Sequence, residues 1–245
     1  MNTLKYKRSY CRKLPHIQPP GATFFITSRL AGSIPREVWL ELRARLDTIY
    51  AEIDDEGADA QTTVLKRERI WFLKYEQYLH ETKGGPYWLE EDRLAVIVAE
   101  TLHHFDQLDQ RRYRLDAFCV MSNHIHVVLM PLPTTAHAIE AHINGKLVKD
   151  REGNIGYLDQ DRQFVPVTFH SLASIMHSIK RQTANLCNKL LNRTGSFWEP
   201  ESYDRYARDH EEWRHMVNYT VNNPVKARLV DEWSQWPWSW RRSNV

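Results

Sequence analysis

The chain has 245 residues, 42% of them hydrophobic, with a formal net charge of +2 and a pI near 8.4. This composition fits an ordinary globular protein with one core, and its mild basicity is too weak to indicate a nucleic-acid partner. Cys11, Cys119 and Cys187 are far apart and odd in number, which argues against a disulfide framework or a four-cysteine zinc site. No apolar run approaches the ~20 residues of a membrane span, and no signal-peptide core is evident. We therefore expect a cytoplasmic protein.

Strands and helices alternate along the chain. Aromatic and β-branched residues predict a strand over residues 22–30, and apolar residues at helical spacing predict helices over 35–53, 67–81 and 90–107, with a loop at 54–63. Only two residues separate the next predicted strand, 115–121, from an apolar run that begins at His124, which indicates a hairpin. The remaining predicted elements are a short helix (137–147), a polar hairpin (around 151–154, closing at 165–167), a helix (171–191), a strand (201–206) and a helix (209–222). This order predicts an α+β protein with a ferredoxin-like (split βαβ) antiparallel sheet and helices packed on it.

We expect a single domain over residues 1–245, decorated by three segments: a basic and aromatic N-terminal segment (1–21), an insertion (134–169) and a Trp-rich C-terminal tail (231–245). The mixture of cations and tyrosines in the first segment suits phosphates and unstacked bases, although a solvated tail has the same composition. The tail tryptophans could stack on bases or fold back and pack on the body. They are Trp233, Trp236, Trp238 and Trp240.

The strand that begins at His124 carries two histidines one residue apart. Successive side chains on a strand point to opposite faces, so His124 and His126 share one face while Ile125 and Val127 take the other. Two imidazoles held together on a rigid strand can bind one cation and leave positions open for a substrate. Two histidines packed on a half-buried strand would give the same pattern.

The last predicted helix carries a second pattern. His215, Tyr219 and Asn223 are four residues apart and form one stripe. A tyrosine with an amide one turn below it is a possible pair of nucleophile and metal ligand, because a nearby cation favours the phenolate. The alternative is a tyrosine packed against the sheet, with Asn223 capping a helix that ends before Pro224.

These two patterns together resemble a known family. His124-Ile125-His126 matches the His-hydrophobic-His motif of single-tyrosine HUH nucleases, and residues 219–230 resemble the signature of REP-associated tyrosine transposases. Further segments agree, in order along the chain: residues 14–16, 19–21, 118–126, 177–180, 197–199, 201–204 and 236–239. The resemblance therefore covers most of the chain.

The resemblance implies a metal-dependent single-stranded DNA endonuclease and strand transferase. His124, His126 and Asn223 would hold a divalent cation, Mg²⁺ or Mn²⁺, and Tyr219 would attack the phosphate to form a 5′-phosphotyrosine link. Related insertion-sequence transposases carry a Gln at the position of Asn223, which is one methylene shorter, so His215 is a second candidate for this ligand. Two imidazoles alone would also suit zinc.

The resemblance also implies a substrate, single-stranded DNA hairpins of the repetitive extragenic palindromic (REP or BIME-like) kind, and thus a nucleoid-associated protein. The predicted DNA contacts are Lys7, Arg8, Arg12, Lys180 and Arg181. The chain would act as a monomer or a homodimer, without a membrane partner. The alternatives are a non-catalytic hairpin-binding protein on the same fold and a zinc-dependent hydrolase that uses the histidine pair.

Overall fold

The structure, a computed structural model, describes residues 9–11, 15–55, 60–81, 85–107 and 111–243. Three predicted DNA contacts, Lys7, Arg8 and Arg12, lie outside the described residues. Within the described ranges, no helix combines the length and the apolar character that crossing a membrane requires.

A five-stranded antiparallel sheet forms the centre of the molecule, in the order β10-β4-β5-β3-β9. Its strands are β3 (Phe24–Arg29), β4 (Tyr113–Val120), β5 (His124–Pro131), β9 (Tyr203–Tyr206) and β10 (Ser239–Arg241). The helix α3 (Asp92–Gln107) connects β3 to β4, and α5 (Leu172–Leu190) connects β5 to β9. The two strands that each helix connects are parallel, and one antiparallel strand lies between them: β5 lies between β3 and β4, and β3 lies between β5 and β9. This arrangement is that of a split βαβ sheet. The predicted ferredoxin-like fold is therefore confirmed.

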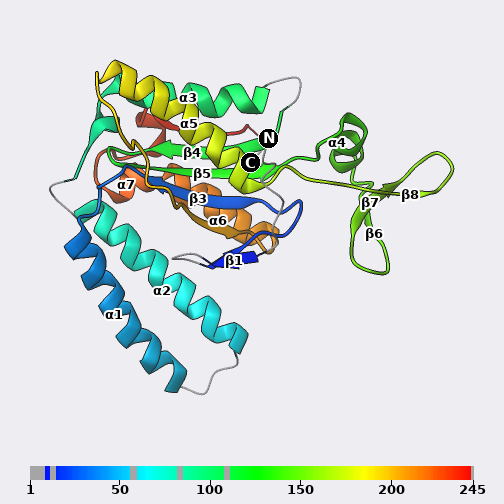
Figure 1. Cartoon of the computed structure of the whole chain (residues 1–245), viewed down its shortest axis with the longest axis horizontal. Helices are drawn as coiled ribbons and strands as arrows, with labels where there is room; N and C mark the ends of the chain where they lie inside the picture. Colours follow the sequence, from blue (N-terminus) through cyan, green and yellow to red (C-terminus); the bar gives the residue numbers. More distant parts are fainter. Residues whose placement is uncertain (1–8, 12–14, 56–59, 82–84, 108–110, 244–245) are drawn as a thin grey trace.

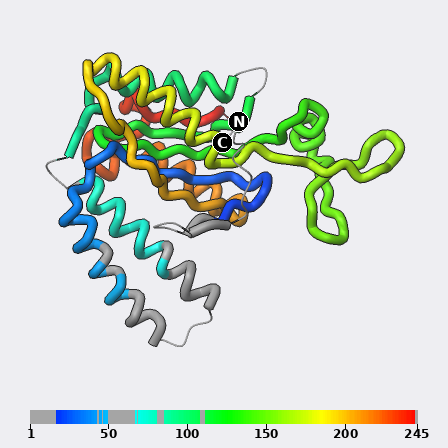
Figure 2. Tube along the Cα trace, in the orientation of Figure 1, coloured from blue at the N-terminus to red at the C-terminus, as the bar shows by residue number. Residues whose placement is uncertain are grey.

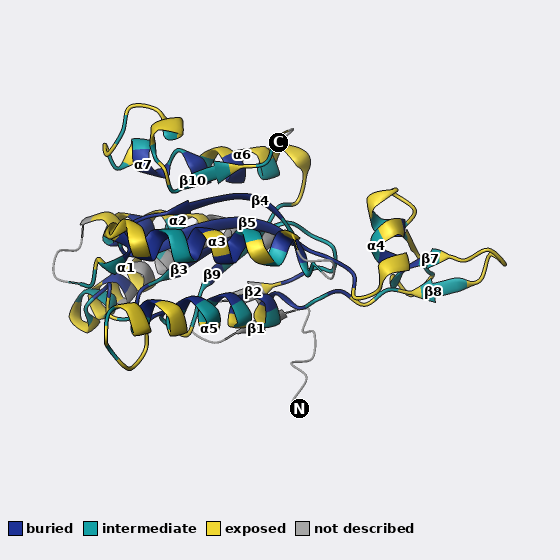
Figure 3. Ribbon diagram, turned by 90° about the horizontal axis from the view of Figure 1, so that it is seen from above, coloured by how far each residue is buried: buried dark blue, intermediate teal, exposed yellow. Residues whose placement is uncertain are grey.

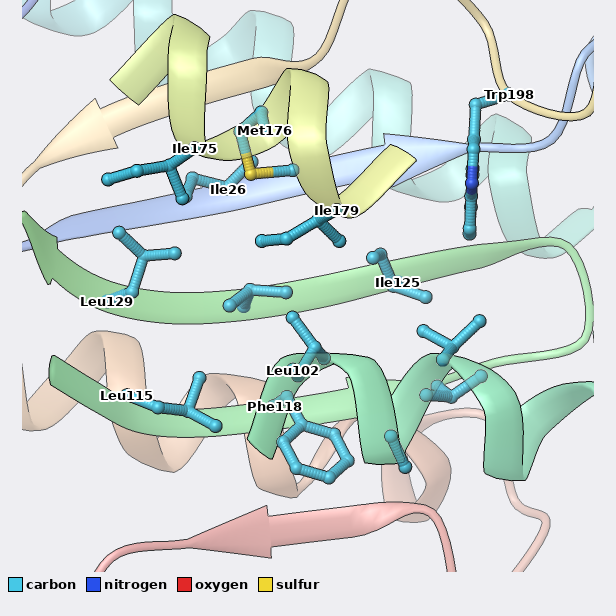
Figure 4. Close-up of a cluster of buried hydrophobic side chains, with 14 of the residues drawn as sticks. Ile26, Leu102, Leu115, Phe118, Ile125, Leu129, Ile175, Met176, Ile179 and Trp198 are labelled. Carbon is cyan, nitrogen blue, oxygen red and sulfur yellow. The ribbon is translucent and has the colours of Figure 1, made fainter. Parts of the chain in front are cut away.

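The two faces of the sheet bury different residues. Helices α3 and α5 cover one face, where alternate residues of the strands form an apolar core (Figure 4). The helix α6 (His210–Val221) lies on the opposite face, so the sheet sits between two helical layers (Figure 3). On β5, Ile125 and Val127 point toward α3 and α5, and His124 and His126 therefore point toward the other face.

Two long helices, α1 (Arg36–Asp55) and α2 (Ala60–Glu81), are inserted between β3 and α3. They form a hairpin that runs diagonally away from the sheet (Figure 1). The predicted loop at 54–63 is shorter in the structure, because α1 continues to Asp55 and α2 begins at Ala60. The buried face of α2 includes Trp71, Tyr75 and Leu79, which pack in the same cluster as Phe25 of β3.

Residues 134–169 form a lobe that projects from the body (Figure 2). A bridge between Pro133 and Phe169 closes its base. The lobe holds α4 (Ala136–Ile143) and a three-stranded sheet, not only the predicted helix and hairpin. The strands of this sheet are β6 (Val148–Lys149), β7 (Ile155–Leu158) and β8 (Phe164–Pro166).

The C-terminal tail packs on the body, which favours the second of its two interpretations. β10 adds to the edge of the sheet beside β4. The indole N–H groups of Trp236 and Trp238 donate to Val120 O and Asp92 Oδ1, each over 3.0 Å. Trp240 packs against the core between the sheet and α3 and α5. These indoles are held within the protein in this structure.

Candidate active site

The two histidines of β5 form the centre of a buried polar cluster. His124 and His126 are 1% and 0% exposed, and their Nε2 atoms lie 3.1 Å apart. The amide nitrogen of Asn123 donates to Leu79 O, so Asn123 Oδ1 is the acceptor for His124 Nδ1 at 2.6 Å. In neutral His124 the proton is therefore on Nδ1, and the Nε2 lone pair is free to bind a cation.

His126 is fixed by the neighbouring strand β3. Its Nδ1 lies 2.9 Å from the hydroxyl of Thr27, the residue directly opposite it in the sheet. Phe25, two residues before Thr27, stacks on the imidazole with the ring centres 5.3 Å apart. These contacts hold the Nε2 atoms of the two histidines toward one another.

A carboxylate from α2 completes the cluster. Glu76 is 5% exposed, and its Oε1 lies 3.5 Å from His126 Nε2. One ligand atom from each of Glu76, His124 and His126 lies within 4.8 Å of the other two, which is a set that could hold a metal ion. Glu76 Oε1 is buried and has no hydrogen-bond partner. Such an atom is costly to bury unless a cation or water satisfies it.

No motif in the sequence singles out Glu76. The only signal is its position on the buried face of α2, among aromatic and apolar residues such as Tyr75 and Leu79. A lone carboxylate on an apolar helix face is rare without a partner, and that rule could have selected Glu76.

Tyr219 and Asn223 reach the same carboxylate from the other side. The Tyr219 hydroxyl donates a hydrogen bond to Glu76 Oε2, and Asn223 Nδ2 donates to the same oxygen over 3.4 Å. Asn223 Oδ1 is buried without a partner. The predicted helix is confirmed, because α6 ends at Val221, before Pro224. A short helix that was not predicted, α7 (Asn223–Lys226), follows it with proline in its first turn.

His215 does not reach the cluster. Its side chain is 75% exposed and lies 3.9 Å from the exposed carboxylate of Glu211. The expectation that His215 could serve as the third ligand is therefore wrong for this structure, because α6 turns its imidazole toward solvent.

Burial sets the protonation states of the cluster. It lowers the pKa of His126 to about 4 and that of His124 well below its ordinary value, so both imidazoles are neutral near pH 7. Burial would raise the pKa of Glu76, but His126 and the hydrogen bond from His80 outweigh it, and the pKa lies well below the usual range. The pKa of Tyr219 is raised, by burial first and then by the charge of Glu76. The resting site thus pairs a phenol with a carboxylate.

Tyr219 also lines an open cavity between α2 and α6. The cavity has a volume of about 710 Å³, and its walls carry both aromatic and charged residues. They include Arg69 and Phe72 of α2, Arg208, and Glu212 of α6. The cavity therefore reaches the Tyr219 side chain, while Glu76, His124 and His126 do not line it.

The two predicted DNA contacts on α5 differ from one another. Lys180 Nζ donates to the carbonyl oxygens of Glu199 and Pro200, at 2.8 and 3.3 Å, and burial lowers its pKa to about 8. In this structure these hydrogen bonds connect Lys180 of α5 to the segment before β9. Arg181 is exposed and free to meet a phosphate.

The fold and the site together define a ferredoxin-like α+β protein with a buried cluster of two histidines and one glutamate beside a tyrosine. No protein-family model matches the sequence. The chain is 31% identical over 67 residues to the REP-associated tyrosine transposase of Escherichia coli (strain K12), a match that covers 27% of this chain and only 38% of that relative. A solved structure of a REP-associated tyrosine transposase bound to a REP hairpin matches with a TM-score of 0.48 and 15% identity, over 94% of this chain and 82% of that one. The sequence match supports the resemblance over about a quarter of the chain.

Proposed function

We propose that this protein is a REP-associated tyrosine transposase of the HUH type, a metal-dependent single-stranded DNA endonuclease and strand transferase. One observation carries the proposal: both imidazoles of the His-x-His motif and the hydroxyl of Tyr219 converge on a single buried carboxylate, Glu76. The convergence joins residues that are far apart in the sequence.

The cluster fits a divalent cation. His124 Nε2, His126 Nε2 and Glu76 Oε1 are the proposed ligands, and the unpartnered Asn223 Oδ1 is proposed as a further one. The donor set of two imidazoles and a carboxylate suits several divalent metals, and we propose Mg²⁺ or Mn²⁺ from the resemblance. When bound, the cation would supply Lewis-acid polarisation of the scissile phosphate.

The chain's own residues supply the nucleophile and a proton acceptor. Tyr219 Oη attacks phosphorus, and its proton passes to Glu76 Oε2, to which it is already hydrogen-bonded, as the bond between Oη and phosphorus forms. The P–O3′ bond breaks, so the products are a 5′-phosphotyrosine link and a 3′-hydroxyl that takes its proton from solvent. Attack by a 3′-hydroxyl on the phosphotyrosine reverses these steps and joins strands. Tyr219 meets Glu76 of the same chain, which supports a site assembled within one protomer of a monomer or homodimer.

The proposed substrate is a single-stranded DNA hairpin of the REP kind, met in the cytoplasm at the nucleoid. The sequence similarity to the REP-associated tyrosine transposase of Escherichia coli supports this substrate class. Among the predicted contacts, the exposure of Arg181 supports its proposed role as a phosphate contact, and Lys180 would first have to release two backbone carbonyls. Lys7, Arg8 and Arg12 remain proposals.

The test is the formation of a covalent adduct between the protein and a labelled hairpin oligonucleotide with a single-stranded flank, in Mn²⁺ or Mg²⁺. Wild type should form an adduct that withstands denaturing electrophoresis, and Tyr219→Phe should form none, because phenylalanine lacks the attacking oxygen. Tyr206→Phe, a change in β9 outside the cluster, is the matched control and should react like wild type.

Three outcomes would redirect the proposal. Hairpin binding by wild type without an adduct would support the non-catalytic alternative. An adduct that persists in Tyr219→Phe would place the nucleophile elsewhere. Hydrolysis that needs zinc and gives no adduct would support the zinc hydrolase.

A further inference from the structure

Lys226, the last residue of α7, lies over the ring of Tyr219. Its Nζ is 3.5 Å from the ring centre. The two residues are seven positions apart, about two helical turns, and helical side chains lean toward the N-terminus. The lysine side chain can therefore reach back along the helical path to the tyrosine.

The ammonium of Lys226 is not used in an ion pair elsewhere. Within the part of the chain that the structure describes, no carboxylate lies within ion-pair distance of Lys226 Nζ. Burial lowers the pKa of Lys226 and the charge of Glu76 counters that effect, while the ammonium in turn lowers the pKa of His126. The lysine charge is thus available to the reacting groups.

The other neighbours of the Tyr219 ring are aromatic. Phe25, Phe72 and His126 lie with ring centres 5.5 to 5.8 Å from it. These contacts already fix the orientation of the phenol. A further contact that only held the ring would not need a charge.

We propose that Lys226 is a catalytic residue of the reaction proposed above, on which this inference rests: its ammonium stabilises the negative charge that develops on Tyr219 and the attacked phosphate. At rest the negative charge is on Glu76. As the phenol proton moves to Glu76 Oε2, the negative charge moves to Tyr219 Oη and then to the phosphate oxygens, while the P–O3′ bond breaks. Lys226 keeps its proton throughout.

The attraction between the Lys226 ammonium and the Tyr219 ring is stronger during the reaction than before it. A cation over an aromatic ring is attracted by the electron density of the ring face, which rises as phenol becomes phenolate. A contact that strengthens only as charge develops lowers the barrier without tightening substrate binding. The same argument holds for strand joining, in which phenolate is the leaving group.

The experiment measures single-turnover cleavage at saturating hairpin, together with the hairpin Kd by fluorescence anisotropy. Lys226→Met keeps the aliphatic stem over the ring and removes the charge. We expect the cleavage rate to fall roughly 10- to 100-fold with the Kd within about threefold of wild type. Lys226→Arg should recover much of the rate. Arg214→Met removes an exposed cation from α6 and should leave both quantities unchanged.

Each outcome is decisive. Wild-type cleavage by Lys226→Met, or a loss confined to the Kd, would overturn the role of Lys226 and leave the proposed function intact. A wild-type protein that forms no adduct would overturn the proposed function, and the role of Lys226 with it. Melting temperatures and far-UV circular dichroism separate catalysis from folding, and Lys226→Gln replaces Lys226→Met if the latter melts early.

Discussion

The two faces of strand β5 differ in what they bury. Toward α3 and α5, the strand presents only aliphatic side chains, which pack with the helices into an apolar core (Figure 4). Toward α2 and α6, the same strand presents His124 and His126, which are buried equally well but bonded to polar partners. Burial on the first face stabilises the fold. On the second face it costs free energy, which hydrogen bonds and neighbouring charges must offset.

This difference explains how a single strand can hold the side chains of a site in fixed positions. Because side chains alternate along a strand, the apolar residues that anchor β5 also fix the direction of the histidines between them. The positions of the two imidazoles are then set by Asn123, Thr27 and Phe25, which contact them on their own face of the sheet. Stability and site geometry therefore belong to different sets of side chains.

The largest expected effect comes from the apolar face. Ile125→Ala removes a fully buried side chain and should lower the free energy of unfolding by about 2–5 kcal/mol, because the removed atoms leave a cavity. Urea denaturation of the apoprotein measures it. Ile143→Ala, at a 60% exposed position in the lobe, is the control and should change stability by less than about 0.5 kcal/mol. A small effect of Ile125→Ala would mean that this face is not the stabilising one.

On the polar face we expect a smaller effect, and we expect it in the affinity for Mn²⁺. Glu76→Gln should weaken Mn²⁺ binding at least about 10-fold, because it removes the charged ligand. The apoprotein should also unfold more easily than wild type near pH 7, because the lowered pKa of Glu76 means that its negative charge stabilises the folded protein. Isothermal titration calorimetry and urea denaturation measure the two quantities, with Glu41→Gln, an exposed change on α1, as control. Equal loss of Mn²⁺ affinity in folded Ile125→Ala would contradict the separation of the faces.

The most gradual effect is a dependence of apoprotein stability on pH. His126 has a pKa of about 4 in the folded protein, lowered by burial, against about 6.5 in the unfolded chain. Between these values the unfolded chain binds the extra proton, so stability is full above about pH 6.5 and falls toward pH 4. His126→Gln should show a shallower dependence than wild type, and His137→Gln, changed at an exposed residue of α4, should keep the wild-type slope. If the stability of His126→Gln fell more steeply with decreasing pH than that of wild type, the pKa of His126 could not be lowered in the folded protein.

The fold could be predicted because its signals are local. The apolar periodicity of α5 and its cap by Ser171, whose hydroxyl accepts from Ser174 N, are both visible in neighbouring residues. The two-residue connection before His124 required a hairpin, and the order of elements then left few arrangements of the sheet. For the candidate site, the two sequence motifs indicated the histidine pair and Tyr219 with Asn223, and no other residue of the cluster.

The remaining features depend on contacts between distant segments. Periodicity shows that one face of α2 is buried, but not that Glu76 on that face will meet His126, a residue fifty positions later in the chain. The position of Lys226 over Tyr219 depends on the short helix α7, which follows directly after the predicted end of α6 and which no pattern in the sequence indicated. The sequence left open whether the tail tryptophans stack on bases or pack on the body. In the structure the tail packs on the body, because β10 pairs with β4 at the edge of the sheet.

The hydrogen bond between Tyr219 and Glu76 joins residues 143 positions apart, which bears on how the protein is made. Synthesis proceeds from the N-terminus, and long-range contacts form late in folding. A nascent chain that has exposed β3, α2 and the β4–β5 hairpin carries both imidazoles and the carboxylate, but not the phenol. Under the proposed function, such a growing chain would acquire its cation ligands before its nucleophile. The order of the residues along the chain would then delay cleavage until α6 has been synthesised and has folded against α2.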